Sequence, residues 1–263
     1  MPPTALVTGA SSGIGDAFAR ILAARGTDLV LTARRSDRLA ALASELRAAH
    51  HCAVDVLIAD LGTPQGRQLV ASTLTHRTID LLVNNAGLGV YAPVAETDPD
   101  VLDAMVQLNV LAVVHLTRAA LPRMLERGTG TIINVASGLA FDPTPTRATY
   151  SGTKAFVVNF TRAVHEEVRD QGVRLQALIP GLIRTEFHDH SGTDVDAVPA
   201  SWLMDPTDLA DASLTGLDLG EVVCVPALPN TAQLAAALTR QSDLTRALVT
   251  NGTPADRYLP SAR

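Results

Sequence analysis

Aromatic side chains and charges are both scarce in this chain of 263 residues. Phe, Trp and Tyr make up 3% of the sequence and charged residues 18%, whereas hydrophobic residues reach 47%. This composition excludes intrinsic disorder, and the core must be built mainly from Ala, Leu and Val. The length fits one large α/β domain better than two ordinary domains.

Cysteine is almost absent. Cys52 and Cys224 are far apart, and each is set among apolar residues. This excludes a disulfide framework and suits a reducing compartment. The first residues are not basic and their apolar run is too short for a signal peptide, and we see no stretch of the roughly 18 apolar residues that a membrane helix needs. We therefore expect a cytoplasmic protein that does not span a membrane.

Positive charge does not dominate either. The formal net charge is −6 and the pI about 5.6. An acidic surface repels nucleic-acid backbones and anionic lipids, so we expect neither nucleic acid nor membrane as a partner. A ligand that carries phosphate would need a local basic pocket.

Short apolar runs alternate with longer segments of helical periodicity. The runs lack polar alternation, which is typical of parallel strands buried on both faces. They lie at Ala5–Thr8, Leu29–Thr32, Ala53–Ile58, Ile79–Val83, Thr131–Val135, Arg174–Leu178 and Val222–Val225. The helical patterns lie at Gly13–Arg25, Asp37–His50, Pro64–Thr75, Pro99–Arg127, Thr149–Gln171, Thr207–Leu219 and Thr231–Val249.

Strand–helix–strand repetition predicts an α/β fold, a doubly wound parallel sheet of about seven strands. No linker of Pro, Gly and Ser divides the chain, so we predict a single domain over residues 1–263. The polar connection at residues 183–203 is longer than most and is predicted to be a substrate loop or lid.

A glycine-rich segment separates the first predicted strand from the first predicted helix. The run Gly9-Ala10-Ser11-Ser12-Gly13-Ile14-Gly15 has the spacing G-x-x-x-G-x-G. Glycines let backbone N–H groups approach a pyrophosphate, and the helix N-terminus adds a favourable dipole. A tight turn with a helix cap is the alternative, but the place between a strand and a helix favours dinucleotide binding.

Arg34 and Arg35 follow the second predicted strand, where dinucleotide-binding folds contact the adenine ribose. A carboxylate there accepts a hydrogen bond from a free 2′-hydroxyl, whereas arginine accommodates a 2′-phosphate. No Asp or Glu stands at this strand end, so we predict NADP(H) as the cofactor. NAD(H) stays the alternative, in which the two arginines are a solvated basic pair.

Tyr150 and Lys154 are four residues apart at the start of a predicted helix, and so lie on one face of it. A phenol is a feeble base at neutral pH, but a nearby cation favours the phenolate and makes proton transfer efficient. Such a pair alone is common on protein surfaces. Here Ser137 follows the fifth predicted strand at the end where open α/β sheets bind ligands. Asn109 stands inside a long helical pattern, where asparagine is a mediocre helix former.

These motifs resemble, in order and spacing from residue 4 to about 185, the short-chain dehydrogenase/reductase family in its shorter, single-domain, Rossmann-like branch. Asn84-Asn85-Ala86-Gly87 and Pro180-Gly181-Leu182-Ile183-Arg184-Thr185, after the fourth and sixth predicted strands, belong to the resemblance. It implies a catalytic tetrad of Asn109, Ser137, Tyr150 and Lys154. It implies a cofactor site formed by Gly9, Ser11, Ser12, Gly13, Ile14, Gly15, Arg34, Arg35, Asp60, Leu61, Asn84, Ala86, Gly87, Tyr150, Lys154, Pro180, Gly181 and Thr185.

The reaction that the resemblance implies interconverts a ketone or aldehyde and an alcohol by hydride transfer. Ser137 would donate a hydrogen bond to the substrate oxygen, and Tyr150 would exchange the proton. Lys154 would lower the pKa of Tyr150 and hold the nicotinamide ribose, while Asn109 would position a water that leads to solvent. A non-catalytic dinucleotide-sensing protein on the same fold is an alternative from another class, but it would typically have a broken tetrad.

Four residues are predicted to contact the substrate: Ser137, Leu139, Phe141 and Trp202. An apolar pocket floor would favour a small molecule with hydrocarbon around its carbonyl or alcohol. Packing of the loop onto the core is the alternative for Trp202.

Two further expectations concern metals and self-association. Two histidines and a carboxylate cluster only at His188-Asp189-His190, with no further ligand spaced to complete a zinc site, so we expect no metal. The apolar helical patterns Val101–Leu125 and Ala155–Val168 predict a homodimer or homotetramer, because the family usually pairs these helices across a two-fold axis.

Overall fold

The computed structural model describes residues 2–192 and 197–258. The chain divides into two compact units, Met1–Pro226 and Ala227–Arg263. The first unit holds every residue that the sequence predicts to bind a cofactor or substrate.

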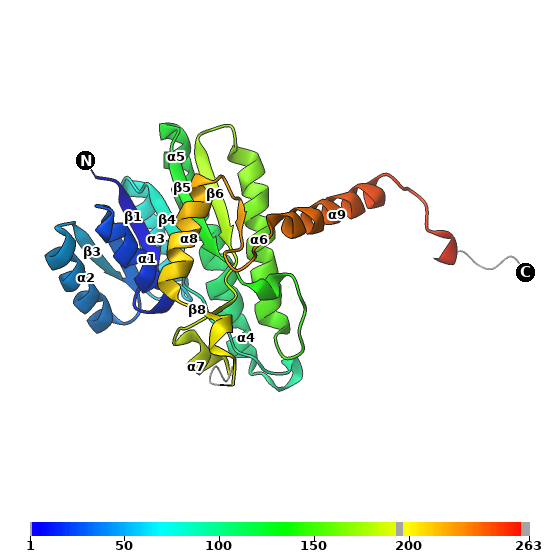
Figure 1. The fold of residues 1–263 in the computed structure, drawn as a ribbon, viewed down its shortest axis with the longest axis horizontal. Coiled ribbons are helices and arrows are strands. Elements are labelled where there is room, and N and C mark those ends of the chain that lie inside the picture. The colour runs from blue at the N-terminus through cyan, green and yellow to red at the C-terminus, as the bar shows by residue number, and fades with distance from the viewer. Residues whose placement is uncertain (1, 193–196, 259–263) are drawn as a thin grey trace, which may run out of the picture. The chain divides into compact units, whose positions relative to one another are not determined.

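The first unit is built on a seven-stranded parallel sheet in the order β3-β2-β1-β4-β5-β6-β9 (Figure 1). Its strands are β1 (Thr4–Thr8), β2 (Asp28–Ala33), β3 (Val54–Ile58), β4 (Leu81–Asn84), β5 (Gly130–Val135), β6 (Val173–Leu178) and β9 (Val223–Cys224). The predicted doubly wound sheet is confirmed, with strand ends shifted by one or two residues. From β1 the chain first builds outward to β3, then returns to place β4 on the other side of β1. Ligands bind at such a switch point, outside the carboxyl ends of the strands.

Helices cover both faces of this sheet. They are α1 (Gly13–Ala24), α2 (Ser36–His50), α3 (Pro64–His76), α4 (Pro99–Val106), α5 (Ala112–Arg127), α6 (Ala148–Val168) and α8 (Pro206–Asp218). On β1, Ala5 and Val7 pack into the core formed with α1, α2 and α8, whereas Leu6 packs into the core formed with α3, α5 and α6. Alternate side chains of one strand thus enter two apolar layers, which explains the continuous apolar runs.

The predicted helix Pro99–Arg127 is interrupted. A π-helical segment, Gln107–Leu111, separates α4 from α5. The run Pro99–Arg127 is also, among the described residues, the one helix long and apolar enough by length and composition to cross a membrane. This finding rests on mean hydropathy over a window, which tolerates isolated polar residues, so it does not contradict the expectation that no unbroken apolar stretch is long enough to span. One such helix is weak evidence for a membrane span, because the core helix of a soluble protein passes the same test.

The predicted loop at residues 183–203 contains regular structure. Strand β7 (Leu182–Ile183) pairs in parallel with β8 (Leu203–Met204), and α7 (Phe187–Ser191) lies between them. Strands of two residues leave no periodicity for the sequence to reveal. Residues 193–196 of this segment lie outside the described part of the chain.

Short 3₁₀ turns complete the first unit at Val94–Glu96, Gly138–Ala140 and Ala200–Trp202. The second unit contains α9 (Thr231–Val249), with the bounds predicted from the sequence, and a 3₁₀ turn at Asp256–Tyr258. Asn230 caps α9 by accepting a hydrogen bond from the Ala232 N–H, and no residue of this helix is buried.

Candidate active site

A pocket of about 640 Å³ lies at the switch point, lined by the segments that follow β1 to β6. Most of the predicted site residues meet there although they are far apart in sequence. Those in the pocket wall are Gly9, Ser11, Ser12, Gly13, Ile14, Arg34, Arg35, Asp60, Leu61, Ala86, Gly87, Ser137, Leu139, Tyr150, Lys154, Pro180, Gly181 and Thr185. Gly15, Asn84, Asn109, Phe141 and Trp202 are not part of the wall.

Glycines shape the loop between β1 and α1. A Cβ on Gly15 would overlap the carbonyl oxygen of Gly9, and a Cβ on Gly13 would lie 2.9 Å from Cγ2 of Thr185. Gly13 also has a φ of 56°, in the left-handed region that favours glycine. The N-cap residue Ser12 makes no capping hydrogen bond through its side chain, which leaves the first N–H groups of α1 to an anion. The loop therefore fits the pyrophosphate of a dinucleotide.

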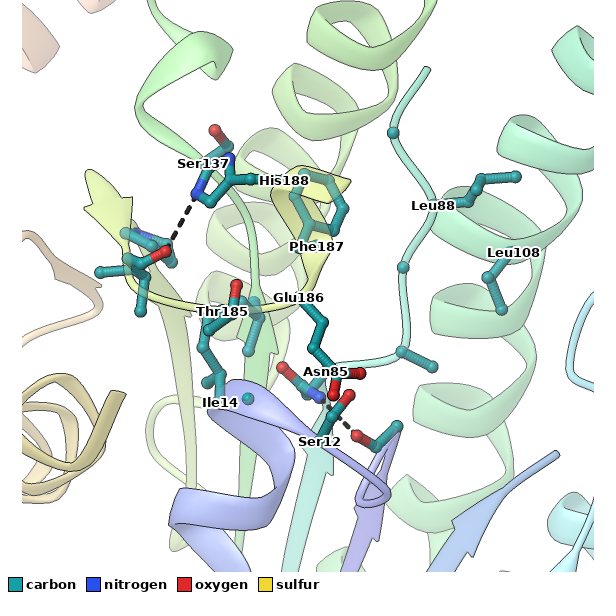
Figure 2. Close-up of a pocket in the computed structure, with 18 of the residues that line it drawn as sticks. Ser12, Ile14, Asn85, Leu88, Leu108, Ser137, Thr185, Glu186, Phe187 and His188 are labelled. Carbon is teal, nitrogen blue, oxygen red and sulfur yellow. Dashed lines mark hydrogen bonds between the residues drawn. The ribbon is translucent and has the colours of Figure 1, made fainter. Parts of the chain in front are cut away.

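Asn85 fastens this loop to the end of β4. Its side-chain Nδ2 donates to the carbonyl oxygens of Thr8 at 2.9 Å and Gly9 at 3.4 Å. The Thr8 hydroxyl in turn accepts from the backbone N–H groups of Asn85 and Ala86. Figure 2 shows the Asn85 side chain at the pocket, and its contacts fix the spacing between the two segments that would hold a dinucleotide.

Asn84, predicted to line the ribose site, points the other way. Its Nδ2 donates to Asn134 Oδ1 at 2.9 Å and to Thr117 Oγ1 at 3.3 Å, and Asn134 donates onward to Thr161 Oγ1. All four side chains are buried. Asn84 thus joins β4 and β5 to α5 and α6 and does not line the pocket, contrary to the prediction.

The basic residues after β2 divide into two kinds. Arg35 donates to the hydroxyls of Ser11 at 3.0 Å and Ser12 at 2.5 Å, and to the carboxylate of Glu186 at 2.9 Å. Arg34 is exposed at the pocket wall, and the described residues offer it no hydrogen bond or ion pair. One arginine is therefore held in place by the phosphate loop, and the other faces solvent.

The side chains after β3 match the predicted adenine side of the site. Asp60 lines the pocket, and its Oδ1 accepts from the Gly62 N–H at 2.9 Å. Leu61 is buried beside it.

Tyr150 lies in the first turn of α6 and is 6% exposed. Burial raises its pKa above the ordinary value for a phenol; nearby Tyr91 adds to the rise, and a hydrogen bond with the Ser137 side chain opposes it. Ser137 reaches this hydroxyl from the end of β5, where its Oγ also accepts from the Leu139 N–H at 3.2 Å. A hydroxyl pair therefore faces the pocket from two elements.

Lys154 is fully buried one turn further along α6. Its Nζ donates to the Val135 carbonyl oxygen at 2.8 Å and lies 5.7 Å from the centroid of the Tyr150 ring. Burial lowers the pKa of Lys154 to about 8. In the structure burial is the largest influence on the pKa of Tyr150 and raises it, so the lowering of that pKa by the Lys154 ammonium stays a prediction.

Asn109 sits in the π-helical segment, where regular α-helical bonding is interrupted. Its Oδ1 accepts from the Leu88 N–H at 2.9 Å, and its Nδ2 donates to the Leu88 carbonyl at 2.8 Å and to Thr153 Oγ1 at 3.0 Å. Asn109 thus links the pocket segment at Leu88 to α6 from behind the pocket wall.

The substrate side of the pocket contains aromatic side chains that sequence reasoning missed. The ring centroids of Tyr91 and Phe187 lie 5.5 Å and 5.8 Å from that of Tyr150. His188 also lines the pocket (Figure 2), and its Nε2 donates to the Ile183 carbonyl at 2.9 Å. A usable signal existed: aromatics are scarce in this chain, and these follow strand ends at the carboxyl edge of the sheet.

Two of the residues predicted to contact the substrate lie away from the pocket. Phe141 is 49% exposed and Trp202 is 67% exposed, and neither lines the pocket. The 3₁₀ turn Gly138–Ala140 carries the chain away from the pocket after Leu139, and Trp202 ends another such turn just before β8. Among the described residues, no group of His, Cys, Asp and Glu could hold a metal ion, and the side chains of Asp189 and His190 are not described.

Comparisons with known proteins agree with this geometry. A family model described as short chain dehydrogenase matches residues 3–196. A short-chain dehydrogenase from Sphingobium yanoikuyae, solved in complex with NADPH, is 36% identical with a TM-score of 0.93, covering 98% of this chain and 100% of that one. A bulky-bulky ketone specific alcohol dehydrogenase from Comamonas testosteroni is 33% identical with a TM-score of 0.86, covering 98% and 99%.

A curated relative is longer than this chain. The very-long-chain 3-oxoacyl-CoA reductase from Anas platyrhynchos is 35% identical over 197 residues, which are 73% of this chain and 63% of the reductase. The family model covers most of the chain and ends beyond the last motif of the pocket. The protein belongs to the short-chain dehydrogenase family, whose members are NAD(P)-dependent oxidoreductases acting on CH–OH groups.

Proposed function

We propose that this protein is an NADP(H)-dependent oxidoreductase that interconverts a ketone or aldehyde and an alcohol with a site of Ser137, Tyr150, Lys154 and Asn109. The observation that carries the proposal is the convergence of Ser137, Tyr150 and Lys154 on the wall of one pocket whose other end carries Arg34 and Arg35. The sequence relatives and solved neighbours support the reaction class.

The chain offers a suitable cradle for the cofactor. The phosphate loop and the N-terminus of α1 would hold the pyrophosphate, Asp60 and Leu61 the adenine, and Arg34 and Arg35 the 2′-phosphate. Ala86, Gly87, Lys154 and the segment from Pro180 to Thr185 would hold the nicotinamide half. The bound nicotinamide supplies or accepts the hydride.

Ser137 and Tyr150 handle the substrate oxygen. The Ser137 hydroxyl donates a hydrogen bond that stabilises negative charge on that oxygen as reduction proceeds. Tyr150 holds at its phenol oxygen the proton that an alcohol product requires. Because burial raises the pKa of Tyr150, the phenol keeps this proton at neutral pH. Reduction needs the protonated phenol and oxidation the phenolate, so this environment favours carbonyl reduction near pH 7.

Lys154 and Asn109 support this pair from behind. The Lys154 ammonium would face the nicotinamide ribose and counter negative charge on Tyr150, since it lies near the ring and beside the backbone of Gly87. Asn109 fixes the backbone at Leu88, which lines the same pocket. Because Asn109 bonds both the N–H and the carbonyl of Leu88, the segment after β4 is held in place where it forms the pocket wall.

The wall near Tyr150 is mainly apolar, with Leu88, Tyr91, Leu139 and Phe187. This favours a carbonyl flanked by hydrocarbon. The solved neighbour named as specific for bulky ketones and the relative named for 3-oxoacyl thioesters point to the same class. NADPH oxidation measured against a panel of ketones, aldehydes and β-ketoacyl thioesters tests the proposal; a purified protein that oxidises NADPH with none of them would contradict it.

NADPH should be preferred over NADH by at least about tenfold in kcat/KM, because one charge-assisted hydrogen bond to the 2′-phosphate exceeds the roughly 1.4 kcal/mol that a decade requires. Arg34→Asp should erode or reverse this preference by placing a carboxylate near the phosphate. Arg240→Asp, the same charge change at an exposed residue that does not line the pocket, is the control. Equal kcat/KM for both cofactors in the wild type would show that neither arginine contributes to cofactor choice.

We also propose that the protein self-associates as a dimer or tetramer in the cytoplasm. Val106 of α4 and Phe156 of α6 are exposed apolar side chains on the helical patterns expected to pair, and Phe156 stacks on Phe160 with ring centroids 5.6 Å apart. Sedimentation equilibrium at micromolar concentration should give a mass of at least two chains. A monomer mass there would contradict the proposal.

A further inference from the structure

A carboxylate already occupies the basic end of the pocket. Glu186, in the segment after β7, accepts from Arg35 at 2.9 Å and from Arg38 at 2.7 Å and 2.8 Å. Figure 2 shows its side chain extending from this segment toward Ser12 of the phosphate loop. Neither Glu186 nor Arg38 was singled out from the sequence, because nothing in their spacing links the end of β7 to the start of α2.

The guanidinium of Arg35 has a partner on each nitrogen. Ser11 and Ser12 accept from Nε and one terminal nitrogen, and Glu186 accepts from the other. The serines are neutral, so Glu186 is the one anionic partner of Arg35 in the described part of the chain. Arg38 and Arg35 lower the pKa of the Glu186 carboxyl, which stays ionised at neutral pH.

We propose that Glu186 is a specificity-determining residue that competes with the 2′-phosphate of NADP(H) for Arg35 and does not compete with NAD(H). The inference rests on the proposed function, in which Arg35 meets that phosphate. A phosphate that approaches this guanidinium must displace the carboxylate or lie beside it, and two like charges on one cation repel each other.

The alternative cofactor meets no such repulsion. NAD(H) presents a 2′-hydroxyl, from which a carboxylate can accept a hydrogen bond. Glu186 therefore weakens the binding of NADP(H), and it leaves the binding of NAD(H) unchanged or strengthens it. It narrows the preference for NADP(H) that the arginines create.

Arg38 allows the 2′-phosphate to replace the Glu186 carboxylate on Arg35. Both ion pairs are partly exposed, with 45% of the Glu186 side chain accessible, so water can replace either contact. When a phosphate takes Arg35, Glu186 keeps its pair with Arg38. Glu186 is thus displaced without losing every partner, and its effect on affinity stays moderate.

The test uses two probes that lack nicotinamide, so it reads binding and not turnover. Adenosine 2′,5′-bisphosphate carries the 2′-phosphate, and adenosine 5′-monophosphate does not. By calorimetry, Glu186→Gln should tighten the bisphosphate about fivefold, the factor expected for removing one like charge at a solvated contact. It should leave the monophosphate unchanged or weaker, and the gain should shrink in about 1 M salt, where exposed charges are screened.

Glu45→Gln is the matched control. Glu45 lies on α2, as Arg38 does, and accepts from both terminal nitrogens of one arginine, Arg20, but neither Glu45 nor Arg20 lines the pocket. This variant should bind both probes as the wild type does. An equal gain in Glu45→Gln would mean that net charge alone acts, and would overturn the inference.

The remaining outcomes separate the inference from the proposed function. If the wild type prefers the bisphosphate but Glu186→Gln binds it equally or more weakly, Glu186 does not compete and the inference is wrong while the cofactor proposal stands. If the wild type binds both probes alike, Arg35 does not read the 2′-phosphate, and the cofactor preference and the inference fail together.

Discussion

Replacing Tyr150 with Phe should lower kcat for carbonyl reduction by about 100- to 10,000-fold, the contribution of a positioned proton donor. The ring of Tyr150 packs between Tyr91 and Phe187, and phenylalanine keeps those contacts. Only the hydroxyl that meets Ser137 is lost. NADPH affinity, measured by fluorescence titration, should stay within about threefold, because the phenol oxygen serves proton transfer and contributes at most one hydrogen bond to cofactor affinity.

Tyr91→Phe is the matched control, since it removes the other phenol of the pocket from a ring in edge contact with Tyr150. Its kcat should fall by less than about tenfold, because Tyr91 has no assigned proton to transfer. If Tyr150→Phe kept more than about a tenth of the wild-type kcat, the loss would be under about 1.4 kcal/mol of barrier lowering and Tyr150 would not be the proton donor.

The pH dependence should differ between the two directions. Because burial raises the pKa of Tyr150, the phenol is protonated throughout the neutral range. The phenolate fraction then rises about tenfold for each unit of pH below that pKa. Alcohol oxidation by the wild type should therefore accelerate with pH while carbonyl reduction stays level, and Tyr150→Phe should lose this difference.

The sheet and most of the pocket could be predicted from the sequence for a physical reason. Parallel strands buried on both faces read as continuous apolar runs, and their carboxyl ends converge on one edge. The spacing of Gly9, Gly13 and Gly15 is also geometric, since Gly15 faces the carbonyl of Gly9 and Gly13 faces Thr185. The glycine spacing is therefore set by close contacts of the loop backbone, and it can be recognised in the sequence without knowing the rest of the fold.

Errors arose where one residue changes the outcome. Strand β4 was expected to end at Val83, which would place Asn84 in the following loop. The strand extends to Asn84, and because successive side chains of a strand point to opposite faces, Asn84 enters the core while Asn85 meets the phosphate loop. The choice between the two asparagines depends on strand register, which apolar runs do not resolve.

The contact between Glu186 and Arg38 and the burial of Tyr150 and Lys154 could not be predicted from the sequence, for another reason. Glu186 and Arg38 are 148 residues apart in sequence, and no local pattern brings them together. The effect of desolvation on Tyr150 and Lys154 likewise depends on everything packed around α6. A Tyr-x-x-x-Lys spacing indicates which groups share a helix face, but it does not show whether burial or the neighbouring cation decides the pKa.

Replacing Lys154 with Met should remove activity and stabilise the fold at neutral pH. The variant keeps an unbranched side chain of similar length but loses the cation near Tyr150, so kcat/KM should fall by about 100-fold or more. Lys154 is the only lysine of the chain. Since burial lowers its pKa from 10.5 to about 8, the folded state bears a cost of about 3 kcal/mol for the charged form at pH 7.

The sign follows from where the proton binds more tightly. The unfolded chain holds the Lys154 proton up to a pKa of 10.5 and the folded chain only up to about 8, so the cost is complete below pH 8. It then fades as pH rises toward 10.5, because the folded lysine becomes neutral first. Losing the hydrogen bond to the Val135 carbonyl offsets about 1 kcal/mol of the gain. Lys154→Met should therefore exceed the wild type by about 2 kcal/mol at pH 7, and this difference should shrink by about 2 kcal/mol at pH 9.5.

Urea unfolding of both proteins at the two pH values measures this difference. Burial raises the pKa of Cys52 and Cys224, so each thiol makes the fold less stable as pH rises, but both proteins contain them and the comparison cancels their effect. A gain in stability that does not change between pH 7 and 9.5 would show that methionine merely packs better. A loss of stability at pH 7 would mean that the ammonium is stabilised in its buried place, and that Lys154 contributes to the fold as well as to the reaction.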